Sequence, residues 1–138
     1  MAEKDVKQGQ SDTCGVDEKL VRHGGLSYLE IPTADAQRSA CFYEVVFGWS
    51  LQDRDTDDPR FEDATGHLIG RWVMGRVISR EPGLLPYIYV NDIHAAVERV
   101  RVHAGEVVRS IFSEGNLWVA TVRDPDGNPL GLWQEAPR

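Results

Sequence analysis

The apolar positions of this chain follow a strand-like pattern twice, and each time a helix-like pattern comes next. The strand-like runs are YLEIP, residues 28–32, and LPYIYV, residues 85–90. In the segments that follow, apolar residues recur three and four positions apart, which is the spacing of one helical face. These positions are Ala40, Tyr43 and Phe47 in the first segment and Val97, Val100 and Ala104 in the second. The pattern predicts a strand followed by an amphipathic helix, twice.

The two strand–helix segments match at a single offset. Asp35 and Asp92 are 57 residues apart, and Asp is a typical N-cap residue. Gly48 and Gly105 are separated by the same 57 residues, and we expect each to end its helix as the left-handed residue. Because the caps and the apolar helix positions all agree at one offset, the pattern indicates an internal duplication.

Strand-like runs continue after each predicted helix. After the first helix come WSLQDRD and GHLIGRWVMGRVI, with the turn-rich segment TDDPRFEDATG between them; after the second come EVVRSIFS, NLWVATV and PLGLWQ. Each half is therefore predicted as strand, helix and up to three strands. Two βαβββ units predict an α+β fold, in which a mixed sheet cups around a concave face and the helices cover its convex face.

The domain organisation follows from the same pattern. Residues 1–22 are mixed in charge and have no aromatic side chain, which predicts a poorly ordered leader. Residues 23–138 are predicted to form one domain, with units at about 23–80 and 81–135.

Charge and composition narrow the classes of partner. The net charge is −7, so neither nucleic acid nor an anionic membrane surface is an expected partner. The chain has no apolar run long enough for a membrane span and no signal-peptide pattern, and we expect a cytoplasmic protein. Neither a GxGxxG nor a P-loop pattern is present, so a nucleotide cofactor is not expected. The two cysteines do not form a CxxC pair, which argues against a thiolate zinc site.

Three stretches together carry a family resemblance. YLEIPTADAQRSACFYEVVFGW, YIYVNDIHAAVERVRVHAGEVV and WVATVRDPDGNPLGLWQ resemble the vicinal oxygen chelate superfamily, which includes glyoxalase I, extradiol dioxygenases and bleomycin-resistance proteins. The resemblance covers residues 23–135. Asp124-Pro125-Asp126-Gly127, which opens the last strand, suits a type I turn.

The resemblance also implies where a divalent metal would bind. Enzymes of the superfamily take His, Gln or Glu ligands from the concave face, and the corresponding positions here are Tyr28, Met74, Leu85 and Gly131. Leucine and glycine offer no side-chain ligand to a metal. We therefore predict no metal ligands and no cofactor, with a divalent metal as the alternative.

Glu30 is the candidate for chemistry, because strand alternation places it on the concave face with Tyr28. In an apolar cup its pKa would be raised, which suits a general acid or base. Aromatic side chains on the strands are candidates for holding a planar ligand, although the faces of Trp72 and Trp118 are not fixed by the sequence. The predicted ligand-binding set is Tyr28, Glu30, Trp72, Tyr87, Tyr89, Trp118 and Trp133.

The leading hypothesis is a metal-free small-molecule binding protein, similar to the drug-sequestering, antibiotic-resistance branch of the superfamily. Its expected ligand is small, organic and planar or aromatic. The resemblance also implies a homodimer, because relatives commonly close the cup by pairing two chains. The alternatives are a metal-dependent glyoxalase-like lyase or dioxygenase using Glu30, His67 and a third ligand, a metal-free isomerase using Glu30, and a module that binds a partner peptide.

Overall fold

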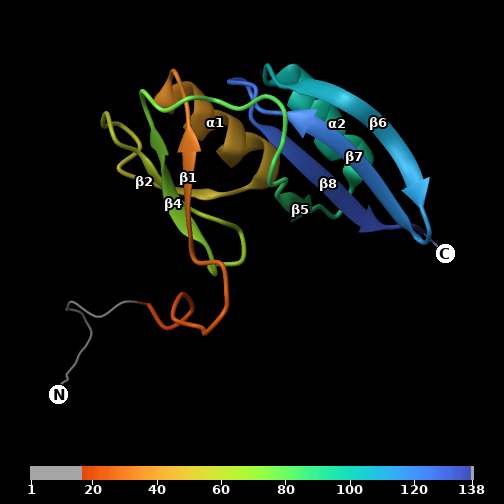
Figure 1. Ribbon diagram of the computed structural model, residues 1–138, viewed down its shortest axis with the longest axis horizontal. Coiled ribbons are helices and arrows are strands. Elements are labelled where there is room, and N and C mark those ends of the chain that lie inside the picture. Colours follow the sequence, from red (N-terminus) through yellow and green to blue (C-terminus); the bar gives the residue numbers. More distant parts are fainter. Residues whose placement is uncertain (1–16, 138) are drawn as a thin grey trace.

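The computed structural model describes residues 17–137, which fold into ten helices and strands (Figure 1). Of the predicted leader, residues 1–16 lie outside the described residues, and residues 17–22 form a short turn near the surface. The elements are β1 (Tyr28–Pro32), α1 (Ala36–Phe47), β2 (Ser50–Gln52), β3 (Arg60–Glu62), β4 (Ile69–Val73), β5 (Tyr87–Tyr89), α2 (Ile93–Val102), β6 (Glu106–Glu114), β7 (Leu117–Arg123) and β8 (Pro129–Glu135).

The strands form two four-stranded sheets with the same topology, in the orders β1-β4-β3-β2 and β5-β8-β7-β6. In each sheet the strand before the helix pairs in parallel with the last strand of its unit, and the other pairs are antiparallel. This confirms the two predicted βαβββ units. Strand β3 lies inside the segment predicted to contain turns, because its three residues are too few for a periodic signal in the sequence.

The helix starts are as predicted, and one helix end differs. The side chain of Asp35 accepts a hydrogen bond from the Arg38 backbone N–H, and Asp92 does the same for Ala95. Gly48 ends α1 in the left-handed region, with φ of 73°.

At the end of α2 the left-handed residue is Ala104, with φ of 71°, and not the predicted Gly105. Ala104 is exposed beyond the helix and does not belong to its buried face. Gly105 is required for a different reason. A Cβ there would lie 2.6 Å from Val100 Cγ1 and 2.7 Å from the Arg123 carbonyl oxygen, so only glycine lets the chain pass this close to β7.

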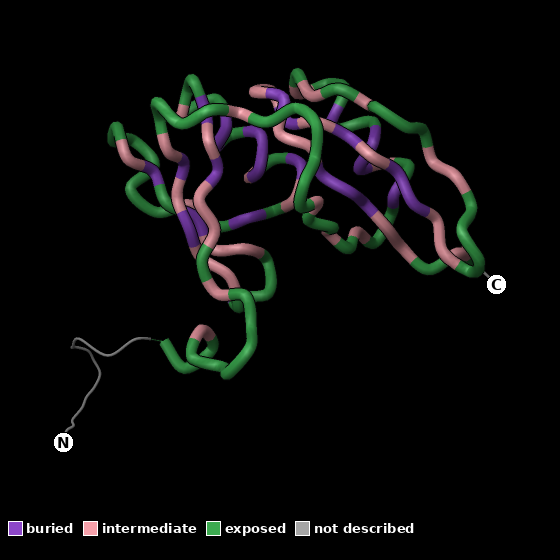
Figure 2. The backbone as a smooth tube through the Cα atoms, viewed as in Figure 1, coloured by how far each residue is buried: buried purple, intermediate pink, exposed green. Residues whose placement is uncertain are grey.

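A single hydrophobic core joins the two units. Helix α1 packs against the first sheet and α2 against the second, and the two helices contact one another. Buried residues are concentrated where helices and sheets meet (Figure 2). The Trp49 ring stacks on Tyr43 and on Phe61, with ring centroids 4.7 Å apart in both pairs. Large aromatic side chains therefore fill most of the first unit's share of the core.

The turn between β7 and β8 fastens the second unit to the first. Its Asp124 is buried and accepts hydrogen bonds from the backbone N–H groups of residues 126, 127 and 128. The hydroxyl of Tyr43, in α1, donates to the same carboxylate at 2.8 Å. Burial raises the pKa of Asp124, and burial beside this carboxylate raises the pKa of Tyr43.

The other polar residues of this turn complete the contact, which we call the clasp (Asp124, Asp126 and Asn128 with their partners in the first unit). Asp126 accepts hydrogen bonds from the Thr33 hydroxyl at 2.6 Å and the Ala34 N–H at 2.9 Å, and it pairs with Arg38 at 2.8 Å. The side chain of Asn128 donates to the Pro32 carbonyl oxygen. The predicted type I turn is confirmed by the bond from the Gly127 N–H to the Asp124 carbonyl oxygen.

Candidate functional site

Each sheet has one face covered by its helix and one face without a helix. On β1, Leu29 and Ile31 pack into the core, so the alternation of the strand places Tyr28 and Glu30 on the helix-free face. This confirms the predicted side of Glu30. The helix-free faces are where the sequence predicts the ligand site.

The helix-free face of the first sheet carries paired charges. Glu30 accepts a hydrogen bond from Arg76 at 2.7 Å and lies 3.7 Å from the Arg71 side chain. Arg71 also lies 3.8 Å from Asp58, which in turn pairs with Arg60 at 3.0 Å. The face is therefore a row of alternating guanidinium and carboxylate groups and not an apolar wall.

These contacts reverse the predicted pKa shift of Glu30. The hydrogen bond from Arg76 holds the pKa of this carboxyl below its usual value, with the charge of Arg71 acting in the same direction. The expectation of a raised pKa was wrong, because the guanidinium groups could not be located from the sequence. A carboxylate held in its ionised form is a weak base, so the geometry gives no support to a catalytic role for Glu30.

The helix-free face of the second sheet is aromatic. Tyr87 and Tyr89 of β5 are both about half exposed, at 53% and 51%. Tyr89 meets Trp133 of β8 edge to face, with ring centroids 5.0 Å apart. The strand register places Tyr87 beside Gly131 and Tyr89 beside Trp133. Three aromatic rings are thus gathered on two neighbouring strands.

Gly131 makes room for one of these rings. A Cβ at this position would overlap the Tyr87 ring, so the absence of a side chain lets the tyrosine lie over the strand. In the sequence prediction Gly131 occupies a position that carries a metal ligand in related enzymes. Here that position is covered by an aromatic surface.

The register corrects one of the four predicted metal positions. Gly131 pairs with Tyr87, and the residue that corresponds to Tyr87 in the first unit is Glu30, which pairs with Arg71. Arg71 is therefore equivalent to Gly131, whereas the predicted Met74 lies beyond the end of β4 and is exposed.

The four positions are thus Tyr28, Arg71, Leu85 and Gly131, and this donor set does not fit a divalent metal. Leucine and glycine have no ligating atom, and a guanidinium repels a cation. Within residues 17–137, no group of three or more His, Cys, Asp and Glu side chains is placed to hold a metal ion, a finding that covers Glu30 and His67.

Trp72 and Trp118 lie on the helix-covered side of their sheets. Trp72 is 3% exposed and lies against Phe61, with ring centroids 5.0 Å apart. Trp118 packs against the core and meets His94 of α2 edge to face. Both were predicted to contact a ligand in the cup. Because they point to the opposite side, the structure does not bring them together with Tyr87, Tyr89 and Trp133.

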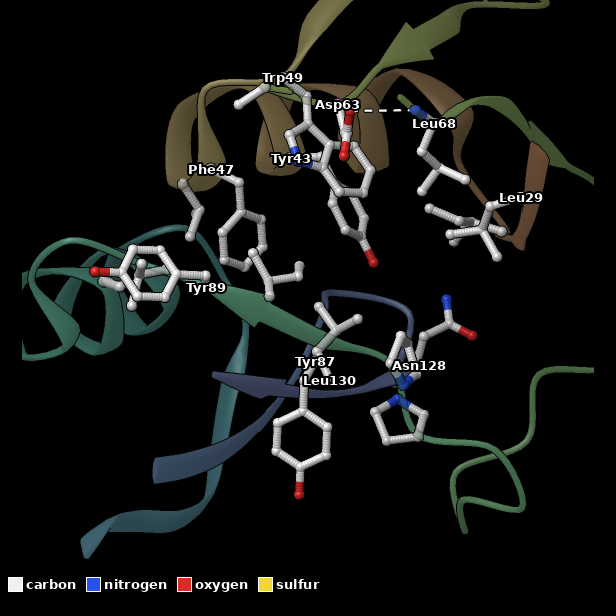
Figure 3. Close-up of a pocket in the computed structure, with 18 of the residues that line it drawn as sticks. Leu29, Tyr43, Phe47, Trp49, Asp63, Leu68, Tyr87, Tyr89, Asn128 and Leu130 are labelled. Atoms are coloured by element: carbon white, nitrogen blue, oxygen red, sulfur yellow. Dashed lines mark hydrogen bonds between the residues drawn. The ribbon is translucent and has the colours of Figure 1, made fainter. Parts of the chain in front are cut away.

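A large cavity of about 1220 Å³ lies between the two units, on their helix-covered sides. Figure 3 shows Tyr43, Phe47 and Trp49 of the first unit facing Leu130 of the second, while the Tyr87 ring points away from them. Glu30, Tyr87 and Tyr89 of the predicted set contribute to its lining. This cavity was not predicted from the sequence, because side chains from both units form it and the pattern of neither unit indicates it alone.

Comparisons with known proteins agree with this architecture. Residues 25–132 match the family model of the Glyoxalase/Bleomycin resistance protein/Dioxygenase superfamily. The putative glyoxylase CFP32 of Mycobacterium tuberculosis is 28% identical over 122 residues, covering 82% of this chain and 46% of that protein. This chain thus spans about half the length of that relative.

Two solved structures show the same fold. A hypothetical protein, SA1046 from S. aureus, has a TM-score of 0.65 at 15% identity, with 80% of this chain and 92% of that chain covered. TnmS3, described as an antibiotic binding protein from Streptomyces sp. CB03234, has a TM-score of 0.61 at 19% identity, with 82% and 97% covered. Among the described residues, no helix has the length and apolar character needed to cross a membrane.

Proposed function

The chain belongs to the Glyoxalase/Bleomycin resistance protein/Dioxygenase superfamily, and we propose that it binds a small planar organic molecule, such as an antibiotic, without a catalytic metal. This proposal rests on the residues that stand where related enzymes have their metal ligands. Gly131 offers no ligand and lies under the Tyr87 ring, while Arg71 brings a positive charge to the equivalent place in the first unit.

The aromatic face of the second sheet suits a planar ligand. Tyr87, Tyr89 and Trp133 present flat apolar area together with hydroxyl and indole N–H groups, and they stand on neighbouring strands. Rigid aromatic side chains lose little conformational entropy when they bind. The description of TnmS3 as an antibiotic binding protein supports a ligand of this class.

We propose that a second copy of the chain completes this site. Within the described residues, β1 and β5 each have a strand partner on one side only, and Tyr28 and Tyr87 on their helix-free faces are about half exposed. A homodimer places the charged face of one chain opposite the aromatic face of its partner and covers both edges. Light scattering after size exclusion is expected to give twice the 15.5 kDa chain mass, and a monomer contradicts this part of the proposal.

A thermal-shift screen in the presence of EDTA tests the proposed function. The panel contains planar aromatic antibiotics and non-planar compounds of similar mass. We expect at least one planar compound to raise the melting temperature with the chelator present, because a ligand that binds only the folded state stabilises it.

Two variants connect that result to the aromatic face. Trp133→Leu removes the largest ring and is expected to abolish the shift, whereas Val108→Ala, at an exposed apolar residue of β6, is expected to retain it. A shift that disappears with EDTA, or that survives Trp133→Leu, contradicts the proposal.

A further inference from the structure

The clasp between the units is made at only one of the two places where the repeat would allow it. The turn between β3 and β4 has the same design as the turn between β7 and β8. The Asp63 side chain accepts hydrogen bonds from the Gly66 and Leu68 N–H groups, as Asp124 does within its own turn. Asp63 and Gly66 thus correspond to Asp124 and Gly127, and Thr65 corresponds to Asp126.

The partners of a second clasp are missing from the second unit. At the 57-residue offset, the clasp residues Thr33, Arg38 and Tyr43 correspond to Val90, Ala95 and Val100. None of these three side chains can form a hydrogen bond, and Thr65 lacks the carboxylate that Asp126 uses. The turn between β3 and β4 therefore has no side-chain means of fastening to α2.

The cavity extends from the clasp, where Pro32, Tyr43 and Asn128 line it, to this unfastened place. Its lining includes Asp63, Ala64 and Thr65 from the turn, and Val90 and Ala95 from the region where β5 leads into α2. Figure 3 shows Asp63 bonded to Leu68 at the cavity, with the first unit on one side and the second unit on the other. Part of the opening between the units thus coincides with the place where a second clasp is missing.

The lining determines the class of molecule that fits. Leu29, Val46, Phe47, Ile88 and Leu130 form apolar walls, and the exposed side chains of Leu26, Val77 and Leu84 extend the apolar surface. The lining carboxylates are already bound locally, since Asp63 is held within its turn, Asp92 caps α2 and Glu30 is paired with Arg76. A cationic ligand group would gain little from these acids, and the guanidinium in the lining, Arg99 of α2, is exposed to solvent, where pairing with an anionic group is worth little. The volume of about 1220 Å³ admits a drug-sized molecule.

We infer that this cavity is a second ligand site, which takes an uncharged, mainly apolar organic molecule between the two units. Glu30, Tyr87 and Tyr89 reach the lining from the strands, but the apolar walls come from the helix-covered sides and no second copy of the chain is needed, so the inference goes beyond the proposed function. Because the clasp fastens the units at one place only, the walls at the unfastened place are free to move toward each other around a bound molecule.

The test is to build the missing clasp. Thr65→Asp combined with Ala95→Arg reproduces the pairing of Asp126 with Arg38 at the equivalent positions. The probe is N-phenyl-1-naphthylamine, a neutral aromatic dye that fluoresces when it enters an apolar site. We expect the wild-type chain to bind this dye and the double variant to bind it at least about tenfold more weakly, because the new pair closes the cavity. The matched control is Val102→Arg with Ser110→Asp, which adds the same charges at exposed positions and is expected to bind like the wild type.

Two further measurements separate this site from the aromatic face. Trp133→Leu is expected to leave dye binding unchanged, because Trp133 does not line the cavity in the described residues. Hydrogen exchange of the wild-type chain is expected to slow on dye binding at residues 63–68 and 88–96. The inference is overturned if the wild-type chain does not bind the dye or if the double variant binds it equally well. It is also overturned if Trp133→Leu loses binding and the dye gives no protection at residues 63–68.

Discussion

The helix-free face of the first sheet carries guanidinium and carboxylate groups in alternation, whereas the same face of the second sheet carries three aromatic rings. The backbones behind these faces have the same topology and the same pairing of the first strand with the last. On the last strand of each unit, at equivalent positions of the pairing with the first strand, the first sheet has Arg71 and the second has Gly131. Duplication has thus kept the architecture while single positions set the chemistry of each face.

The largest difference in stability is expected between variants of the two turns, β7–β8 and β3–β4. Asp124→Ala removes a buried carboxylate and leaves the Tyr43 hydroxyl and the backbone N–H groups of residues 126 and 128 without their acceptor, while the Gly127 N–H keeps its bond to the backbone carbonyl of residue 124. We expect a loss of about 3–5 kcal/mol in the free energy of unfolding. Asp63→Ala, in the turn that makes no clasp, is expected to cost only about 1 kcal/mol. Urea denaturation followed by tryptophan fluorescence measures both values.

Tyr43→Phe is the control for the contact between the units. It removes the hydroxyl that bonds to Asp124 and keeps the ring in the core, so we expect an effect between those of the two aspartate variants. Equal destabilisation by Asp124→Ala and Asp63→Ala would mean that the clasp does not fasten the units.

A smaller difference in stability is expected between alanine variants of Gly70 in the first unit and Gly131 in the second. A Cβ at Gly70 would overlap the Leu29 carbonyl of the neighbouring strand, and backbone cannot move aside easily. Gly70→Ala is therefore expected to cost more than about 2 kcal/mol. A Cβ at Gly131 would meet the Tyr87 ring, which can rotate toward solvent because the residue is 53% exposed.

We expect Gly131→Ala to cost about 1 kcal/mol and to disturb ligand binding more than stability. Thermal melts and titration of the ligand from the screen give the two numbers separately. If Gly131→Ala retains full affinity, the Tyr87 ring does not contribute to the site.

The smallest expected effect is in the pH dependence, where carboxyl groups of the two units act in opposite directions. The pKa of Glu30 is lowered, so its pairing with Arg76 stabilises the fold fully above the ordinary glutamate pKa and is lost as the pH falls through the folded value. The pKa of Asp124 is raised, so its ionisation disfavours the fold, and this effect appears as the pH rises through the carboxyl range.

Glu30→Gln is therefore expected to lower the melting temperature slightly at pH 7, where the ionised pair is lost, and to converge with the wild type below about pH 4, where the glutamate is itself protonated. The decline of the melting temperature with falling pH is thus smaller in the variant. Melting curves between about pH 3 and pH 7 show this slope directly. If the melting temperature of Glu30→Gln falls with pH as steeply as that of the wild type, groups other than Glu30 cause the acid sensitivity of the fold.

Local signals in the sequence were sufficient for the two βαβββ units, although not for the short strand β3 or for the division into two sheets. The capping residues Asp35 and Asp92, the apolar periodicity of the helices and the turn beginning at Asp124 each depend on neighbouring residues only. For the same reason the side of Glu30 on its strand was predicted correctly, while the pKa of Glu30 depends on Arg76, which is distant in the chain.

The faces of the tryptophans needed information that the sequence does not contain. Trp72 and Trp133 both follow the aspartate that opens their turn by nine residues. The first turn closes between Asp63 and Leu68, and the second between Asp124 and Asn128, so the first is one residue longer. A shift of one residue moves a side chain to the other face of a strand, and Trp72 is buried in the core as a result.

We propose that this member of the superfamily has an aromatic surface where its metal-dependent relatives have a metal centre. The metal content of the protein, purified without a chelator and measured by mass spectrometry of its elements, tests this claim most directly. We expect Zn, Ni, Mn and Fe each at less than about 0.1 equivalent per chain, because Leu85 and Gly131 have no ligating atoms and Arg71 repels a cation. A stoichiometric metal that remains through dialysis and is lost from a variant at Tyr28 or Glu30 would contradict the account.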